Sequence, residues 1–164
     1  ASLTSIFSTT GARSVGQPGL RMMLELSRKP AMTRDAFVAR RMVLSRFIGG
    51  RGFPNDAEEA REIFGRSFDR GGLAQHAGTG RQIGAIIASG DRTAELSGIT
   101  APTLVIHGDR DPLVHPSGGL ATAKAIPGAQ HRTIKGMGHE ITTALSPQLA
   151  ALIADHIQRA ERPK

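Results

Sequence analysis

One stretch of the sequence, Thr103-Leu-Val-Ile-His-Gly-Asp-Arg-Asp-Pro112, indicates the fold. Its first four residues form an apolar run in which three are β-branched, which is typical of a strand buried on both faces of a parallel sheet. The residues from His107 to Pro112 have the composition of a turn, so the run ends abruptly. We therefore expect a strand over 103–106 inside a parallel sheet.

The residues after this stretch predict a helix, a second strand and a second helix. The first helix covers 118–126, and the strand covers 130–134. The last helix starts at Ser146-Pro147, where we expect Ser146 to be the N-cap and Pro147 to occupy the first helical position. Strand, helix, strand and helix in this order are typical of a right-handed parallel crossover unit in an α/β fold.

The N-terminal part of the chain predicts one strand followed only by helices. Residues 1–17 contain a short core strand over 3–8 and a glycine-containing loop. Residues 18–98 predict four helices without a strand between them, which we interpret as a helical cap, and residues 99–164 form the C-terminal core unit. In the last cap helix, from Gly80 to Ser89, we expect three residues to face inward: Ile83, Ile86 and Ile87.

The composition of the 164 residues excludes several kinds of protein. With Cys 0, the chain has no disulfide, no thiolate nucleophile and no zinc site that needs sulfur. It also lacks the run of roughly 18 apolar residues that spans a membrane. No metal is expected, since His139-Glu140 is followed at position 143 by Thr, where a second ligand histidine would stand. The absence of cysteine is compatible with a cytoplasmic location, which is the location we expect.

The positive charge of the chain raises the question of a nucleic-acid partner. The net charge is +7, but the arginines are scattered along the sequence. Aromatic residues make up 4% of the chain, with no Tyr or Trp that could stack on bases. We therefore expect no nucleic-acid partner.

Two side chains of catalytic character follow the two predicted strands. Asp111 stands in the loop after strand 103–106, and His139 stands in the loop after strand 130–134. Because the carboxyl ends of neighbouring parallel strands meet at one edge of a sheet, we expect these loops to lie side by side. A carboxylate beside an imidazole fixes its tautomer and stabilises the imidazolium, so the pair would be the orienting half of a nucleophilic triad.

Other polar residues near these loops have structural interpretations. Asp109 is expected to be a turn carboxylate with no direct role in the chemistry. His107 ends the apolar strand and is expected to be a buried, hydrogen-bonded histidine near the site. His115 and His131 are expected on the surface.

The two loops resemble the C-terminal part of an α/β-hydrolase. The segment Ile106-His-Gly-Asp-Arg-Asp-Pro-Leu-Val114 looks like that family's acid loop, in which the Asp before Pro is the triad acid, and Gly136-Met-Gly-His139 looks like its histidine loop. The opening Leu3-Thr-Ser-Ile-Phe-Ser-Thr-Thr-Gly11 is similar to the strand before the helical cap in esterase- and lipase-like members, including anthracycline methylesterases. The resemblance implies a partial α/β-hydrolase fold with Asp111 and His139 as catalytic residues, and it implies no cofactor.

The nucleophile of that family is missing from the sequence. It stands in Gly-x-Ser-x-Gly at a sharp strand-to-helix turn, and none of the eleven serines has glycine at both of those positions. We therefore expect the C-terminal portion of a serine hydrolase that cleaves small-molecule carboxylic esters, inactive alone because its nucleophile lies upstream. The alternatives are epoxide or haloalkane opening or perhydrolysis on the same fold, and a catalytically inactive half-domain that acts as an interaction module.

The missing N-terminal half would be a partner of this chain, and its absence predicts self-association. Strand 3–8 would lie between a missing strand and strand 103–106, which leaves one of its edges unpaired. This edge carries no Lys, Pro or inward charge that discourages pairing. We expect a twofold dimer that either pairs the strand with its copy antiparallel or buries the two open sheets together.

Overall fold

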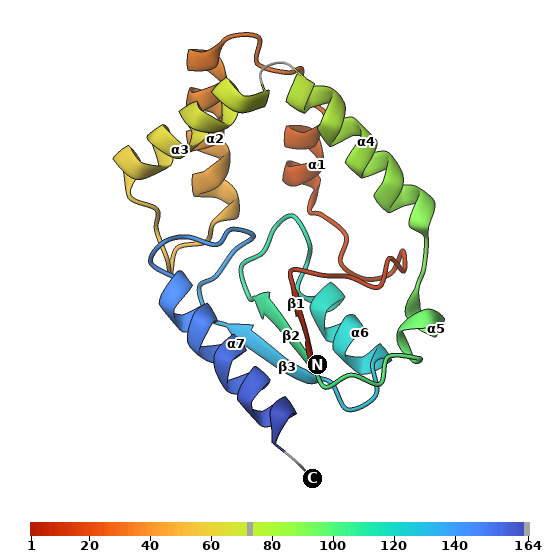
Figure 1. Cartoon of the computed structure of the whole chain (residues 1–164). Coiled ribbons are helices and arrows are strands. Elements are labelled where there is room, and N and C mark those ends of the chain that lie inside the picture. The colour runs from red at the N-terminus through yellow and green to blue at the C-terminus, as the bar shows by residue number, and fades with distance from the viewer. Residues whose placement is uncertain (72–73, 163–164) are drawn as a thin grey trace.

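The protein has a three-stranded parallel sheet beneath a layer of helices (Figure 1). A computed structural model describes residues 1–71 and 74–162, the side chains of 74–77 excepted. The strands are β1 (Leu3–Ile6), β2 (Thr103–Gly108) and β3 (Gln130–Ile134), and they lie in the order β1-β2-β3. The sheet confirms the predicted partial α/β fold. The first strand is shorter than the predicted 3–8, because Phe7 leaves it with a positive φ of 58°.

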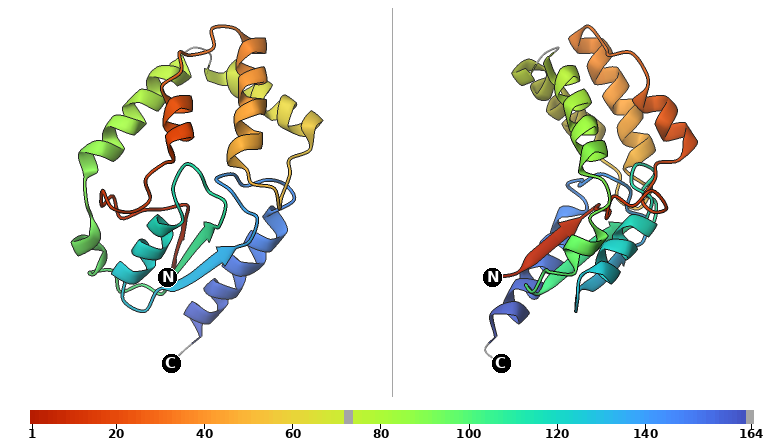
Figure 2. Two further views of the ribbon diagram at one scale, coloured as in Figure 1. Left: turned by 180° about the vertical axis from the view of Figure 1, so that it is seen from behind. Right: turned by 90° about the vertical axis from the view of Figure 1, so that its right-hand side faces the viewer.

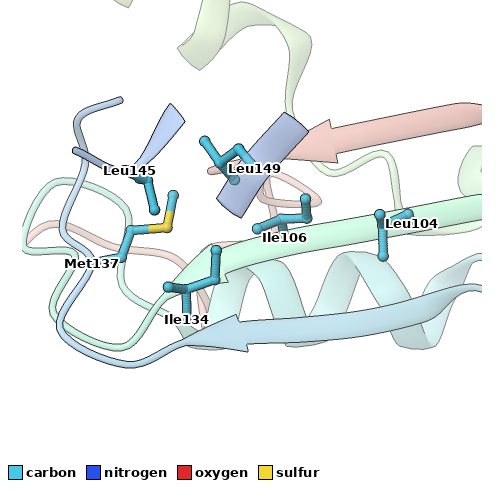
Figure 3. Close-up of a cluster of buried hydrophobic side chains, with 6 residues drawn as sticks. All are labelled: Leu104, Ile106, Ile134, Met137, Leu145 and Leu149. Atoms are coloured by element: carbon cyan, nitrogen blue, oxygen red, sulfur yellow. The ribbon is translucent and has the colours of Figure 1, made fainter. Parts of the chain in front are cut away.

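Two helices cover the two faces of the sheet (Figure 2). They are α6 (Ser117–Ala125), between β2 and β3, and α7 (Ser146–Glu161), after β3. All six residues of β2 are buried, which explains the apolar run that predicted this strand. On the α7 side, a core cluster joins residues of β2, β3, α7 and the loop between β3 and α7 (Figure 3): Leu104, Ile106, Ile134, Met137, Leu145 and Leu149.

Among the described residues, five helices lie between β1 and β2; the first four form the cap, and the last lies beside α6 (Figure 1). The five helices are α1 (Leu20–Leu26), α2 (Arg34–Ile48), α3 (Ala57–Gly71), α4 (Ala74–Ser89) and α5 (Thr93–Leu96). The second and third helices pack together through a separate apolar cluster: Phe37, Val38, Ala60 and Phe64. Among the described residues, no helix is both long enough and apolar enough to cross a membrane.

The inward orientation predicted for the isoleucines of α4 is wrong. Ile86 is 65% exposed, Ile87 is 75% exposed and Ile83 is 37% exposed. The helix itself also starts earlier than predicted, at Ala74 rather than Gly80. The period of apolar residues identifies one face of a helix, but it does not show whether another element covers that face.

The predicted N-cap of the last helix is also wrong. Ser146 is already the first residue of α7, and Leu145 occupies the cap position. The reason is that the preceding turn runs directly into the helix: the peptide N–H groups of Leu145 and Ser146 both donate to the carbonyl of Thr142. The Ser146 hydroxyl donates to the same carbonyl instead of accepting from the first turn.

The cap lies beyond the carboxyl ends of the strands, and its base contacts the loop after β3 (Figures 1 and 2). The peptide N–H of Gly138 donates to the carbonyl of Gly49 over 3.0 Å, and that of His139 donates to the carbonyl of Ile48 over 2.6 Å. The two backbones approach so closely that a Cβ at Gly138 would lie 1.9 Å from the oxygen of Ile48. Glycine is therefore required at position 138 by the space available.

Substitution of Gly138 by alanine is expected to destabilise the fold. The new methyl group would push the β3–α7 loop away from the cap, at a cost of about 3 kcal/mol. Gly84→Ala is the matched control, because nothing lies within 4 Å of its Cβ position in the middle of α4. That change should stabilise the helix by about 0.5–1 kcal/mol. Urea unfolding followed by circular dichroism measures both effects, and equal effects of the two substitutions would contradict the proposed close contact.

One edge of β1 is unpaired within the described part of the chain. The strand pairs in parallel with β2, from Leu3 opposite Thr103 to Ile6 opposite Ile106. The peptide N–H groups of Leu3 and Phe7 donate to the carbonyls of Pro102 and Ile106. Because peptide groups alternate along a strand, the N–H of Thr4 points away from β2 and is available to another strand.

We expect the chain to form a twofold dimer through this edge or through the open sheet. Sedimentation velocity at micromolar concentration should give about twice the mass of 17.3 kDa. Thr4→Pro removes an outward N–H and should shift the equilibrium to the monomer if the edge is the interface. Ser5→Ala is the control on the same strand and should leave the dimer intact. A clean monomer that binds no hydrophobic dye would refute self-association.

Candidate active site

Asp111 lies in the loop after β2 and is buried, at 4% exposure. Its Oδ1 atom accepts the peptide N–H groups of Leu113, over 2.9 Å, and of Val114, over 2.8 Å. Such contacts of an aspartate with the residues two and three positions ahead stabilise a turn. The loop thereby fixes the carboxylate and leaves its Oδ2 atom for other donors.

His139 lies in the loop after β3, and its Nδ1 atom is 2.7 Å from Oδ2 of Asp111. The two residues that the sequence placed at the ends of neighbouring strands are therefore in direct contact. The His139 side chain is 23% exposed, whereas that of Asp111 is inaccessible. No described side chain forms a hydrogen bond with the second ring nitrogen, Nε2.

A second imidazole contacts the same carboxylate. His107, at the end of β2, is fully buried, and its Nε2 atom lies 3.2 Å from Oδ2 of Asp111 and 2.8 Å from the carbonyl of Val114. Its burial near the site was predicted, but the contact with Asp111 was not. Its Nδ1 atom has no hydrogen-bond partner, so only one of the two ring nitrogens is hydrogen-bonded as predicted.

These contacts set the charge of Asp111. Burial raises the pKa of the carboxyl, but the hydrogen bonds from the two imidazoles and from the Val114 peptide more than offset this, and the pKa falls to about 2. The carboxylate is therefore ionised at neutral pH although it is buried. An ionised acceptor at 2.7 Å holds the proton of His139 on Nδ1 and leaves Nε2 unprotonated when the ring is neutral.

Asp109 has the structural position that the sequence predicted. Its Oδ1 atom accepts the peptide N–H of Gly136 over 2.6 Å, which joins the loop after β2 to the loop after β3. No hydrogen bond or ion pair joins it to His139 among the described residues. The prediction for His131 is only partly right, since its Nε2 atom is buried without a partner. His115 is exposed, as predicted, and contacts the hydroxyl of Ser117.

Phe7 contacts both imidazoles, although the sequence suggested only a strand residue. Its ring centroid is 4.6 Å from that of His139, with an angle of 35° between the planes. It meets His107 edge-on at 6.2 Å and 90°. Its position at the carboxyl end of a predicted parallel strand was the signal that could have found it.

Glu140, the residue after His139, binds the cap through its side chain. Sequence reasoning did not predict this contact either. One carboxylate oxygen, Oε2, accepts the Ser45 hydroxyl over 2.6 Å and the Asn55 amide over 3.0 Å. The amide also donates to the hydroxyl over 2.9 Å. Beside Ser45 and Asn55 lies a cavity of about 320 Å³ between α2 and α3, which neither Asp111 nor His139 lines.

The arrangement can orient and move a proton, but no nucleophilic side chain in the described part of the chain contacts His139. Ser45, which is buried, is engaged with Glu140. Among the side chains that the structure describes, no group of three or more His, Asp or Glu residues could hold a metal ion. What the described residues provide is a buried carboxylate and a partly exposed imidazole in the geometry of a general base.

Known proteins resemble this chain in sequence over most of its length. Residues 87–164 match a family described as TAP-like protein, within the α/β-hydrolases. The rhodomycin D methylesterase of Streptomyces peucetius is 35% identical over 144 residues, which cover 84% of this chain and 46% of that protein. The corresponding enzyme of Streptomyces sp. (strain C5) is 34% identical over 144 residues, with the same coverage. This chain thus spans less than half the length of these relatives.

Solved structures show the same fold at lower sequence identity. A meta-cleavage product hydrolase from Pseudomonas fluorescens IP01 matches 98% of this chain and 56% of its own, with a TM-score of 0.70 and 17% identity. An esterase from Rhodococcus sp. ECU1013 matches 96% of this chain and 55% of its own, with a TM-score of 0.62 and 15% identity. The chain therefore shares part of the α/β-hydrolase fold, and its sequence resembles esterase-like members of that family.

Proposed function

We propose that this chain is the C-terminal portion of a serine hydrolase that cleaves carboxylic esters. The observation that carries the proposal is the contact of 2.7 Å between the buried Asp111 carboxylate and Nδ1 of His139. The similarity to two methylesterases supports an ester as the substrate. The nucleophilic serine would come from a part of the fold that this chain does not contain.

In this proposal His139 performs the proton transfers of acyl transfer, and Asp111 orients its imidazole. Asp111 holds the Nδ1 proton of His139, so Nε2 accepts the proton of the serine hydroxyl as its oxygen attacks the ester carbon. The imidazolium then gives this proton to the departing alkoxide, and an acyl-enzyme remains. Water repeats the sequence on the acyl-enzyme, with His139 again as base and then acid, and releases the carboxylic acid.

The substrate class to test first is a small-molecule methyl ester. The relatives are named as rhodomycin D methylesterases. The alignments with them, at 34–35% identity, cover 84% of this chain. The helical cap lies beyond the strand ends where Asp111 and His139 meet, so it would cover the ester and select its shape (Figure 1).

The first test measures ester hydrolysis with and without a nucleophile. The chain alone should show no turnover of a nitrophenyl ester or a methyl ester, whereas fusion to the N-terminal half of the Streptomyces peucetius enzyme should give turnover. In the fusion, Asp111→Asn should lower kcat by about 10⁴-fold, because the wrong imidazole tautomer would be favoured. Asp109→Asn should cost far less, since its side chain only accepts the N–H of Gly136.

Each result of this test has a different meaning. Equal losses from the two substitutions would contradict the assignment of Asp111 as the acid. An active fusion that leaves esters intact but opens epoxides or haloalkanes, or forms peracids, would show that the reaction is not ester hydrolysis. Labelling of a serine of this chain by a fluorophosphonate, with turnover, would overturn the proposed upstream nucleophile. A folded fusion without any of these activities would favour an interaction module.

The low pKa of Asp111 predicts a pH-dependent contribution to stability. Because the folded pKa of about 2 lies below the usual 3.8, the contribution is full above about pH 4 and is lost as the pH falls towards 2. Its size is about 2 kcal/mol from the shift in pKa. Asp111→Asn should therefore lower the free energy of unfolding at pH 7, and the difference from wild type should shrink between pH 4 and pH 2.

Urea unfolding at several pH values measures this difference. Asp155→Asn is the control, because Asp155 is an exposed carboxylate paired with Arg159, and solvent screens such pairs. It should change the stability little at any of these pH values. A deficit of Asp111→Asn that stays constant from pH 7 to pH 2 would show that it does not arise from the ionised carboxylate.

A further inference from the structure

Phe7 has an unusual backbone conformation. Among the described residues, it is the only one other than glycine with a positive φ, at 58°. This left-handed region is unfavourable for a bulky side chain, and an aromatic residue there calls for a structural or functional reason. The position is well fixed, since the peptide N–H of Phe7 still donates to the carbonyl of Ile106 over 3.1 Å.

The positive φ changes the direction of the Phe7 side chain. In a regular strand, consecutive side chains point to opposite faces of the sheet, so Phe7 would point away from the face that Ile6 covers. Instead, both residues pack against the core cluster on the α7 side of the sheet. The left-handed conformation therefore brings the Phe7 ring to the side on which His139 lies.

The ring then contacts the imidazole that the proposed reaction needs. Its centroid lies 4.6 Å from that of His139, at an angle of 35°. The hydrogen bond to Asp111 fixes only one atom of the imidazole, Nδ1. The imidazole can still rock about that bond, and a flat apolar surface against its face restricts this motion. Phenylalanine has no polar atom that competes with Asp111 for the Nδ1 proton.

We propose that Phe7 is a positioning residue for His139, held in a left-handed conformation so that its ring stacks on the imidazole. This proposal rests on the proposed function only for its catalytic consequence, since the contact itself belongs to the folded chain. It makes the residue that follows β1 a part of the active site, in addition to the loops after β2 and β3.

The test compares two substitutions that separate the ring from its apolar volume. Phe7→Leu keeps an apolar side chain but removes the flat ring, and Phe7→Tyr keeps the ring. Phe68→Leu is the matched control, because Phe68 packs against Phe37 in the cap, at 5.4 Å, and does not touch His139. The first measurement is the NMR signal of the His139 Nδ1 proton in the full 164-residue chain, which needs no activity.

We expect Phe7→Leu to broaden or shift this proton signal, and Phe7→Tyr and Phe68→Leu to preserve it. In the active fusion, Phe7→Leu should lower kcat by about 10²-fold with little change in KM, as is typical when a catalytic group is misplaced by about 1 Å. Phe7→Tyr should restore most of this loss. An unchanged proton signal and an unchanged kcat in a folded Phe7→Leu chain would overturn the proposal.

The outcomes distinguish this proposal from the proposed function. If Asp111→Asn and Phe7→Leu both leave turnover unchanged while Phe7→Leu still alters the His139 signal, the positioning contact stands and the proposed function fails. If Asp111→Asn abolishes turnover and Phe7→Leu alters neither signal nor kcat, the function stands and the positioning role fails. If Phe7→Leu lowers the unfolding temperature as Phe68→Leu does, with no change at His139, Phe7 is only a packing residue and the proposal is overturned.

Discussion

The site depends on the hydrogen bonds that keep the buried Asp111 carboxylate ionised. An ionised carboxylate without water is stable only when each of its oxygens has donors. Two peptide N–H groups of its own loop serve Oδ1, and two imidazoles meet at Oδ2. One imidazole ends β2 and the other follows β3, so this carboxylate requires the two strands to be parallel neighbours. The register of Leu104 opposite Gln130 through Gly108 opposite Ile134 meets that requirement.

The second constraint is the close approach of two backbones that lie far apart in the sequence. The cap residues after α2 meet the loop of His139 through main-chain hydrogen bonds, and glycine at 50 and 138 makes room for them. A Cβ at Gly50, which has a φ of 79°, would lie 2.3 Å from the carbonyl oxygen of Gly136. The bonds from Ser45 and Asn55 to Glu140 add a side-chain connection at the same place. The base of the cap therefore cannot move without moving the peptide of His139.

The sequence predicted those features that local pattern and strand topology determine. The run at 103–106 identified a buried strand, and the rule that parallel strands end at one edge was enough to bring Asp111 and His139 together. It could not predict the contacts that depend on packing between distant segments. The left-handed turn of Phe7 has no sequence signal because phenylalanine avoids that conformation. The exposure of Ile86 and Ile87 also depends on packing, because a periodic pattern does not show whether another element covers the apolar face of a helix.

The residues that would perform the proposed chemistry and those that orient the His139 imidazole come from different parts of the chain. Asp111, His107 and His139 all lie within the region 87–164 that matches the family. The groups that hold the His139 loop from the other side lie before it: the Phe7 ring, the carbonyls of Ile48 and Gly49, and the Ser45 and Asn55 side chains that bind Glu140. A hydrogen bond to one ring nitrogen fixes a distance, whereas contacts on the ring face and on the peptide fix the orientation of the imidazole. The N-terminal strand and the cap are therefore structural parts of this site.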